Sequence, residues 1–387
     1  MSQSKIKDFA INKSDWTKVK FGHVVVEPRE SIVDSKEEGI ERAVGLEHLD
    51  SDEIRLTRFS SVNEGAMFTK KFLKDDVLFG RRRAYLRKAS QVLFNGVCSG
   101  DITVMRAKNG LLPSLLPFIV NNDKFFDYAI THSAGGLSPR VKFKDLAEYE
   151  FFLPPEDQQS NLAELLWDIV SVCQANIALR QQLEVALSTF EYEYFSSKDC
   201  DNVNLKDVVI KTLSGGTPDS KKMEFYTEGS IPWITTKILE GDYISEGEKY
   251  ITHDAIKNSA AKILPKANIV AGTRVGVGKF AINKVDISFS QDVTGLIIDN
   301  KKIDITYLIH QLNSSPFQKK IKPLLRGTTI KGVTKDDLLN LAIALPDKVG
   351  QEKCKSDIEL IKKGILDINL AIKSSYLMQK TIISKVF

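Results

Sequence analysis

The chain has 387 residues, of which 42% are hydrophobic and 27% are charged, with 23 glycines and 12 prolines. This composition excludes a disordered or fibrous protein, and the length predicts two or three globular units. The formal net charge of +4, spread over so long a chain, does not by itself indicate a partner.

The cysteines and histidines give no sign of a disulfide framework or a metal site. Cys98, Cys173, Cys200 and Cys354 form no C-x-x-C pair, and the five histidines lack ligand spacing, so we expect no metal and a reducing compartment. The N-terminus has no signal-peptide core, and two prolines interrupt the most apolar run, residues 111–120. We therefore expect a cytoplasmic protein without a membrane segment.

An internal repeat sets the expected architecture. Residues 75–89 align with residues 267–281, and residues 141–154 align with residues 333–346, both at an offset of 192. One residue of slippage between these segments places Ser99, Asp101 and Thr103 on Ser290, Asp292 and Thr294. The shared offset indicates one unit that is present twice.

In chain order, the sequence predicts a domain, a long helix, and then the same pair again. Residues 1–155 and 199–347 hold short β-like runs and turn signals, which are typical of mixed α/β domains. Residues 156–198 and 348–387 are predicted as long helices, because proline is absent from 156–195 and 348–387. The predicted fold class is α+β, with two similar mixed α/β domains separated by two long helices and an internal pseudo-twofold repeat of about 192 residues.

Each predicted helix carries an apolar seam with alternating steps of four and three residues. Eight of ten seam positions are apolar in both helices, which is typical of a coiled coil. The seam positions that we expect to mediate pairing are Leu162, Leu166, Ile169, Asn176 and Leu183 in the first helix and Ile358, Ile361, Ile365, Ile368 and Ile372 in the second.

Charge favours pairing of the two helices with each other. Residues 156–195 carry seven acidic and one basic side chain, whereas residues 348–387 carry eight basic and four acidic ones. Opposite charges attract across a seam, and forty helical residues span roughly 60 Å, so the helices are predicted to form a rigid spacer. Asn176 and Arg180 interrupt the first seam, and we favour a role in setting register over a role in docking a partner.

Basic residues cluster at equivalent places in the two domains. Residues 79–88 hold five basic side chains around Tyr85, and residues 317–335 hold six, neither with an acidic residue. Such clusters neutralise phosphates, so nucleic acid is the expected partner, although any single basic run is more often a solvated face. Trp233 could stack on a base, but a core position is the better interpretation, and Gly272 to Lys279 fails the spacing of a phosphate loop.

The order of domain, helix, domain and helix resembles the specificity subunit of type I restriction-modification enzymes. The resemblance covers nearly the whole chain and rests on SGGTP (214–218), IPWI (231–234), AGTRVGVGKF (271–280), SFSQDVTGL (288–296) and the LPP or LPD boundary before each helix. It implies two target-recognition domains that each read one half of a split double-stranded DNA target. It also implies an antiparallel coiled coil that sets the gap and docks two methyltransferase (modification) subunits. The first domain has VEPRE (26–30) where the second has SGGTP, so its DNA-contacting loop is expected to differ.

The resemblance further implies that this chain has no catalytic residue and holds no cofactor. S-adenosylmethionine would be bound by the partner methyltransferase subunits, and ATP by the restriction or translocase subunits. In agreement, the sequence has no N-P-P-[YF] or D-P-P-[YF] methyltransferase motif. The side chains that we expect to contact DNA are Arg81, Arg82, Arg83, Tyr85 and Arg140 in the first domain and Thr217, Lys237, Arg274, Lys279, Arg326 and Lys331 in the second.

Two alternatives stay open at the level of sequence. The chain could serve as the recognition subunit of a simpler two-component methylating nuclease, which its own sequence hardly distinguishes. It could also be a non-catalytic coiled-coil scaffold whose two domains grip proteins instead of DNA, and failure to bind any duplex would favour that alternative.

Overall fold

The computed structural model describes residues 12–33, 38–63, 68–196, 201–327 and 331–387. Residues 197–198 of the first predicted helix, and Cys200, lie outside the described residues. The chain forms two compact units, residues 1–178 with 369–387, and residues 179–368. Each long helix is therefore divided between the two units, whereas the sequence predicts each helix as a separate segment between or after the domains.

The first globular domain is built from short strands and short helices, with a 3-10 turn (η1) beside the arginine cluster. Its elements are β1 (Thr17–Lys20), α2 (Phe21–Val24), β2 (Val25–Val26), β3 (Arg42–Val44), β4 (Ser60–Ser61), β5 (Lys70–Phe72), β6 (Val77–Gly80), η1 (Ala84–Leu86), β7 (Ala89–Gln91), β8 (Gly96–Cys98), β9 (Ile102–Ala107), α3 (Leu116–Val120), α4 (Asp123–Thr131), α5 (Phe143–Leu146) and β10 (Glu150–Leu153). The strands form two four-stranded sheets, β2-β9-β6-β7 and β4-β3-β8-β5, and the pair β1-β10. Strand β6 is buried along its whole length, which explains its continuous apolar sequence VLFG.

The second globular domain repeats this plan. Its elements are β11 (Asn202–Asn204), η2 (Leu205–Val208), β12 (Val209–Ser214), η3 (Met223–Phe225), β13 (Ile231–Ile234), η4 (Thr236–Ile238), β14 (Tyr243–Ile244), β15 (Lys249–Ile251), α7 (His253–Lys257), β16 (Ile269–Gly272), β17 (Phe280–Asn283), β18 (Ser288–Phe289), β19 (Val293–Ile298), α8 (Ile305–Asn313), α9 (Ser315–Ile321), η5 (Lys322–Leu324), α10 (Lys335–Leu339) and β20 (Ala342–Ala344). The strands form the sheets β12-β19-β16-β17-β14 and β15-β13-β18 and the pair β11-β20. The order β12-β19-β16-β17 matches β2-β9-β6-β7 of the first domain, so the internal repeat is confirmed at the level of topology.

Individual hydrogen bonds also repeat. Gln159 donates its amide to the carbonyl of Pro154 at 3.0 Å, and Gln351 donates to the carbonyl of Pro346 at 2.9 Å. The Gln159 amide oxygen accepts from the N–H of Leu112, and that of Gln351 accepts from the N–H of Asp304. All three pairs of positions differ by 192, so the offset found in the sequence superposes equivalent places in the two domains.

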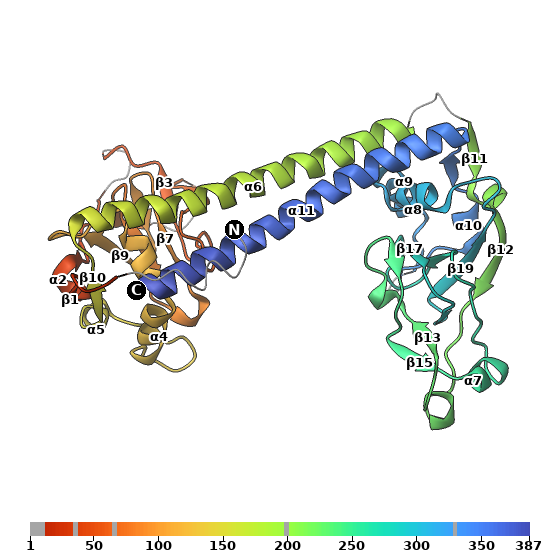
Figure 1. Cartoon of the computed structure of the whole chain (residues 1–387), viewed down its shortest axis with the longest axis horizontal. Coiled ribbons are helices and arrows are strands. Elements are labelled where there is room, and N and C mark those ends of the chain that lie inside the picture. The colour runs from red at the N-terminus through yellow and green to blue at the C-terminus, as the bar shows by residue number, and fades with distance from the viewer. Residues whose placement is uncertain (1–11, 34–37, 64–67, 197–200, 328–330) are drawn as a thin grey trace. The chain divides into compact units, whose positions relative to one another are not determined.

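The two long helices are α6 (Glu156–Ser196) and α11 (Lys348–Val386), and within each unit the segment of α6 runs antiparallel to the segment of α11 (Figure 1). In the first unit, Leu166 and Ile169 near the start of α6 share a core with Ile382 and Val386 at the end of α11. In the second unit the partners are reversed, since Phe190 and Tyr194 at the end of α6 pack with a core that contains Cys354 and Ile358 at the start of α11. Every position of the two predicted seams is buried or half-buried.

Helix α6 is also long and apolar enough, by length and composition alone, to cross a membrane, although the sequence predicts no such segment. A helix that packs in a domain core passes the same test. Ala163, Leu166 and Val170 of α6 are buried in the core of the first unit, as expected of a core helix.

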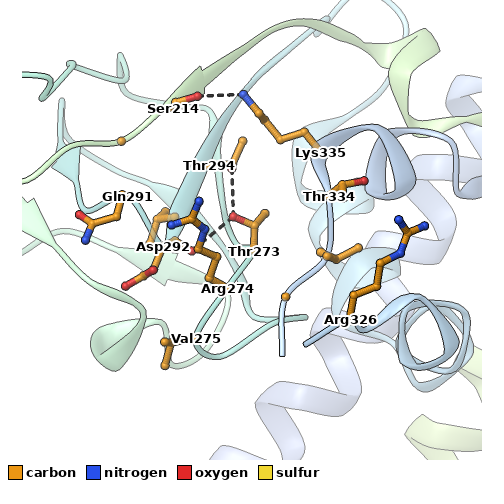
Figure 2. A pocket seen from close by; sticks show the side chains of 14 residues that line it. Ser214, Thr273, Arg274, Val275, Gln291, Asp292, Thr294, Arg326, Thr334 and Lys335 are labelled. Carbon is orange, nitrogen blue, oxygen red and sulfur yellow. Dashed lines mark hydrogen bonds between the residues drawn. The ribbon is translucent and has the colours of Figure 1, made fainter. Parts of the chain in front are cut away.

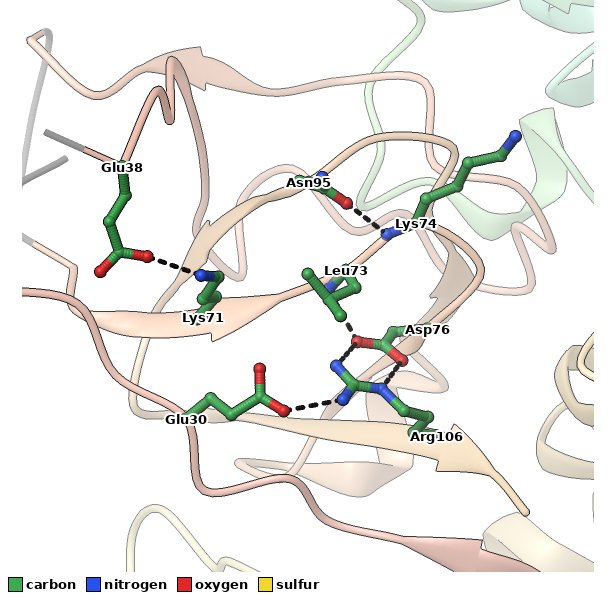
Figure 3. A network of polar contacts seen from close by, with 8 residues as sticks. All are labelled: Glu30, Glu38, Lys71, Leu73, Lys74, Asp76, Asn95 and Arg106. Atoms are coloured by element: carbon green, nitrogen blue, oxygen red, sulfur yellow. Dashed lines mark hydrogen bonds and ion pairs between the residues drawn. The ribbon is translucent and has the colours of Figure 1, made fainter. Parts of the chain in front are cut away.

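The two domains satisfy the hydrogen bonds of one equivalent buried polar position, Asp76 in the first domain and Asn268 in the second, with different partners. Arg106 of β9 donates two hydrogen bonds of 2.8 Å to the buried carboxylate of Asp76 and one to Glu30. The N–H of Leu73 also donates to Asp76 (Figure 3). The hydrogen bonds that Arg106 donates to Asp76, followed by the one it donates to Glu30, outweigh burial and raise the pKa of Arg106.

In the second domain Asn268 takes the place of Asp76. Its side-chain nitrogen donates to the carbonyl of Pro265, and its oxygen accepts from the N–H of Ile298. Proline has no N–H to offer a carboxylate, so an amide that can donate fits this position and no arginine is needed.

Candidate nucleic-acid interface

A cavity of about 930 Å³ opens in the second domain (Figure 2). It lies where the end of β12, the turn after β16, the turn before β19 and the start of α10 meet. Its polar lining side chains are Ser214, Thr273, Arg274, Gln291, Asp292, Thr294, Arg326, Thr334 and Lys335.

Backbone hydrogen bonds fix the shape of this cavity. The N–H of Thr273 donates to the carbonyl of Asp292 at 2.9 Å, and the N–H of Val333 donates to the carbonyl of Thr273 at 2.8 Å. The buried hydroxyls of Thr273 and Thr294 are hydrogen bonded to each other at 3.1 Å. Glycine is required at position 215, because a Cβ there would lie only 2.0 Å from the carbonyl oxygen of Ser290.

The lining combines positive charge with groups that donate and accept hydrogen bonds. Lys335 donates to the hydroxyl of Ser214 at 2.8 Å, and Arg326 forms an ion pair of 3.1 Å with Asp337 while its side chain stays 70% exposed. The exposed amide of Gln291 accepts a hydrogen bond of 2.6 Å from Thr217. Such a set of groups can bind phosphate through its cations and base edges through its amide and arginines.

The equivalent place in the first domain is filled by an ion-pair network. Asp101 accepts hydrogen bonds from Arg140 Nε at 2.7 Å and from Arg82 Nη1 at 3.4 Å. The hydrogen bond from Arg140, partly opposed by burial, lowers the pKa of Asp101. Nη2 of Arg82 also donates to the hydroxyl of Ser138 at 3.1 Å.

The structure brings together three of the five expected contact residues of the first domain. Arg82 and Arg140 face each other in a β-bridge, and the N–H of Arg83 donates to the carbonyl of Pro139 in the same loop. Tyr85 is 52% exposed in η1. Arg81 differs, because its Nε is buried and has no hydrogen-bond partner among the described residues.

In the second domain only two of the expected contact residues, Arg274 and Arg326, line the cavity. Thr217 reaches it through its hydrogen bond to Gln291. Lys237, Lys279 and Lys331 are exposed but do not line it. Trp233 is 7% exposed and donates to the carbonyl of Gly216, so the prediction of a core position is confirmed.

Several polar residues of the two sites were not predicted as contacts. The acidic pair Asp101 and Asp292, together with Ser138, Gln291 and Lys335, lies at the centre of the sites. The internal repeat could have identified this pair, because Asp101 and Asp292 are aligned in a segment in which the neighbouring serines and threonines also match. A search for positive charge alone passes over a carboxylate of this kind.

Part of each basic run serves the fold instead of the surface. Arg87 forms ion pairs of 2.7 Å with Asp52 and Asp123, and its guanidinium lies 4.7 Å from the ring of Phe126. Lys320 donates to the carbonyl of Ala342, and burial lowers its pKa. The positive charge left on the surface for a ligand is therefore smaller than the sequence clusters indicate.

The described residues hold no group of three or more side chains suited to a metal ion. The described cysteines, Cys98, Cys173 and Cys354, are buried, and burial raises the pKa of the Cys98 and Cys354 thiols to about 12. Such thiols are poor nucleophiles at neutral pH.

Comparison with protein families identifies the second domain. Residues 197–365 match the family model described as the type I restriction modification DNA specificity domain. The MjaIX specificity subunit of Methanocaldococcus jannaschii is 31% identical over 159 residues, which are 40% of this chain and 36% of that protein. The EcoR124I/EcoR124II specificity subunit of Escherichia coli is 26% identical over 222 residues, 54% of each chain. The match thus spans about a third to a half of the length of these relatives.

Solved structures share the fold over nearly the whole chain. A structure from a study of complex assembly in the type I restriction-modification system has a TM-score of 0.62 at 19% identity and covers 96% of this chain and 97% of its own. The type I S subunit from M. genitalium has a TM-score of 0.60 at 12% identity and covers 98% of each chain. The HsdS subunit from Thermoanaerobacter tengcongensis has a TM-score of 0.52 at 19% identity and covers 97% of each. The predicted fold class and the resemblance stated from the sequence are confirmed.

Proposed function

The chain carries a type I restriction modification DNA specificity domain and shares the fold of type I specificity subunits, and from this premise we propose that it is the DNA-recognition subunit of a type I restriction-modification system. Its two globular domains would each read one half of a gapped, asymmetric duplex target. The long helices would set the gap between the two halves.

One observation carries this proposal. The two domains present different polar side chains at the same place on one backbone plan, Arg82, Asp101 and Arg140 in the first domain and an open cavity with Arg274 and Asp292 in the second. Two similar domains with unlike contact surfaces suit a target whose halves differ in sequence. A protein that bound one repeated ligand would need matching surfaces.

The chemistry of the two sites separates anchoring from recognition. Exposed lysines such as Lys237, Lys279 and Lys331 can neutralise phosphates in a way that does not depend on sequence. Arginine, amide and carboxylate groups in the two sites can distinguish base edges in the major groove.

The helices also offer surfaces for partner subunits. Leu165, Val172 and Leu179 of α6 are spaced seven residues apart and are all exposed, so they form an apolar stripe on a face away from the seam. Leu366, Leu370 and Leu377 form a second exposed stripe on α11. We propose that two methyltransferase (modification) subunits bind these stripes, and that restriction or translocase subunits join through them.

The proposed division of labour places all catalysis on the partners. This chain would be non-catalytic and would hold no cofactor, with S-adenosylmethionine on the methyltransferase subunits and ATP on the restriction subunits. The complex would act in the cytoplasm, where DNA is accessible.

The decisive experiment maps methylated adenines in the host genome with and without this chain, in cells that express the accompanying methyltransferase. Methylation confined to one gapped, two-part motif and lost on deletion is the expected result. An unchanged pattern with an active methyltransferase would contradict the proposal.

Two further measurements separate the alternatives. Duplex binding by the full complex should weaken steeply as salt rises, whereas a protein scaffold would bind no duplex at any salt concentration. Restriction that depends on an ATP-driven translocase distinguishes the type I assembly from a simpler two-component methylating nuclease.

A further inference from the structure

The two domains carry their arginines on opposite sides of one conserved bridge. In the first domain the backbones of Ala134 and Arg140 exchange hydrogen bonds of 3.0 and 2.9 Å. In the second domain Arg326 and Gly332, each 192 residues further on, exchange bonds of 2.9 and 2.8 Å. The position of Arg140 is therefore occupied by glycine in the second domain.

This exchange changes the environment of the conserved acidic residue. In the first domain Asp101 binds two arginines, with Arg140 Nε and Nη2 at 2.7 and 3.3 Å from its two oxygens and Arg82 Nη1 at 3.4 Å. In the second domain Asp292 has no salt bridge within the described part of the chain and lines the open cavity beside Arg274 (Figure 2).

The backbone holds Asp101 firmly in place. Its N–H donates to the hydroxyl of Ser99 at 3.3 Å, and its carbonyl accepts from the N–H of Arg81 at 3.0 Å. Its side chain is 23% exposed, so the carboxylate is a semi-buried anchor and not a mobile surface charge.

Each arginine keeps donors for a ligand. The side chains of Arg82 and Arg140 are 40% and 43% exposed. A guanidinium has five N–H donors, and the described contacts with Asp101 and Ser138 use only some of them. The free donors lie on a rigid fork, which matches the paired O6 and N7 acceptors of guanine.

We infer that Asp101 is a positioning residue that orients Arg82 and Arg140 to read guanine in the half-site bound by the first domain. This inference rests on the proposed function and names the base chemistry of one half-site. The second domain lacks this arrangement, because glycine stands at position 332 and Asp292, which lines the cavity, has no salt bridge among the described residues.

Contact with phosphate is the competing role for these arginines, and the geometry disfavours it. A carboxylate between two guanidinium groups repels a phosphate and reduces the net charge of the group of three to +1. It also restricts long, mobile side chains to one geometry, which benefits a directional contact with a base more than a contact with a diffuse charge.

The test is selection of bound duplexes from a randomised, gapped library by the full chain in complex with its methyltransferase. The variants are Asp101→Asn, Arg140→Lys and, as the matched control at the equivalent place, Asp292→Asn. Lysine keeps the charge but lacks the fork. We expect Arg140→Lys and Asp101→Asn to reduce preference for a guanine in one half-site by about tenfold or more, while the other half-site is unchanged. Asp292→Asn should leave that guanine preference intact.

The outcomes separate this inference from the proposed function. A gapped motif that lacks guanine in the affected half, or a guanine preference that survives either first-domain variant, overturns the inference but leaves the function standing. Absence of any gapped motif with the wild-type complex overturns the function itself.

Salt dependence and stability complete the test. A salt slope that stays the same in Arg140→Lys while specificity falls supports a base contact. Unchanged specificity in that variant supports a phosphate contact and contradicts the inference. Thermal unfolding of Asp101→Asn shows whether the domain is intact, and Arg140→Lys tests the same contact without removing the anchor.

Discussion

The first and second domains share a backbone plan but differ in the polar groups placed on it. Gln159 and Gln351 make the same contacts in both domains, as do the paired backbone bonds of Ala134 with Arg140 and of Arg326 with Gly332. The side chains around these bonds differ in charge.

Three equivalent places illustrate the difference. Asp101 is bound by two arginines, whereas Asp292 faces an open cavity. Buried Asp76 is neutralised by Arg106, whereas Asn268 needs no partner charge. The comparison indicates that backbone hydrogen bonds, in the strands and in the turns, maintain the shared fold. The side chains at the sites can therefore differ between the two domains.

A third contrast lies where each domain meets its helices. Phe118 and Val170 pack in the apolar core of the first unit. The equivalent positions in the second unit are His310 and Lys362, which are hydrogen bonded at 3.1 Å and both lie close to the carboxylate of Asp242. One contact is apolar and the other is an ion-pair cluster, so the two units should respond differently to pH.

Lengthening both helices tests whether they set the spacing between the half-sites that the two domains bind. Of the changes considered, we expect this one to have the largest effect. Inserting seven residues after Ala178 and seven after Ile368, at the boundaries of the compact units, adds about 10 Å to each helix. That length corresponds to about three base pairs of DNA. Affinity for the original target should fall by about a thousandfold, towards the non-specific level.

Selection from duplexes with gaps of different length measures this effect. If the helices set the gap, affinity should recover on a target whose gap is longer by about three base pairs. An insertion in α6 alone is the control, because it shifts one seam against the other and should recover on no gap. An undiminished preference for the original gap would contradict the proposal that the helices set the gap.

The sequence was sufficient for the repeat and the seams because both depend on spacing. Leu166, Ile169, Ile358 and Ile372 follow heptad steps that can be read without a structure, and all four are buried. The predicted mixed α/β domains follow equally from short apolar runs between turns.

The sites could be predicted only in part, because a charge in a sequence does not show its partner. Arg87 belongs to the first basic run, but Asp52 and Asp123, each about 35 residues away, turn it inward. Asp101 and Gln291 carry no positive charge and were not predicted as contacts, although they lie among the groups that shape the sites.

Removing Arg106 should destabilise the first domain more than any change at the equivalent position destabilises the second domain. Arg106→Ala leaves the carboxylate of Asp76, which is 2% exposed, with the N–H of Leu73 as its remaining donor. An unpaired buried charge of this kind costs about 3 kcal/mol of unfolding free energy. Chemical denaturation of the full chain measures the loss, and hydrogen exchange assigns it to the first domain.

The double variant Asp76→Asn/Arg106→Ile is the matched control, because it installs the solution of the second domain, where Asn268 and Ile297 stand at these places. It removes the charge together with its partner, so much of the lost stability should return. If the single variant costs less than about 1 kcal/mol, the ion pair does not hold this part of the fold.

Neutralising Asp242 should destabilise the second unit in a way that depends on pH. Burial alone would raise the pKa of Asp242, but hydrogen bonds from His310 and Lys362 outweigh it and hold the pKa well below its usual range. A carboxyl whose folded pKa is depressed stabilises the fold fully above its unfolded pKa of about 3.9. This contribution declines below that value and is lost as pH falls through the lower folded pKa. Asp242→Asn should therefore cost about 2 kcal/mol at pH 7, because Lys362 is only one-third exposed and loses its partner, and clearly less at pH 3.

Val170→Ala is the comparison in the first unit, and its cost should be the same at both pH values because it removes only apolar contact. Nearby Glu191, whose pKa burial raises, also titrates in acid, so the difference between wild type and Asp242→Asn is the quantity to follow. A difference that does not change between pH 7 and pH 3 would show that the Asp242 charge contributes nothing.

The change with the smallest expected effect introduces the arginine of the first site into the second site. Gly332→Arg places an arginine at the position of Arg140, near Arg274 and near Asp292, which has no salt bridge in the part of the chain that the structure describes. A Cβ at position 332 would lie 3.2 Å from the carbonyl oxygen of Thr273, so the loop must shift by a few tenths of an ångström. We expect binding to the original target to weaken about tenfold and the second half-site to gain a preference for guanine. Gly332→Ala measures the cost of the shift alone and should change affinity without changing the selected bases. If Gly332→Arg selects the same bases as the wild type, the arginine pair does not determine the base, and the difference between the two domains at this place concerns stability instead of recognition.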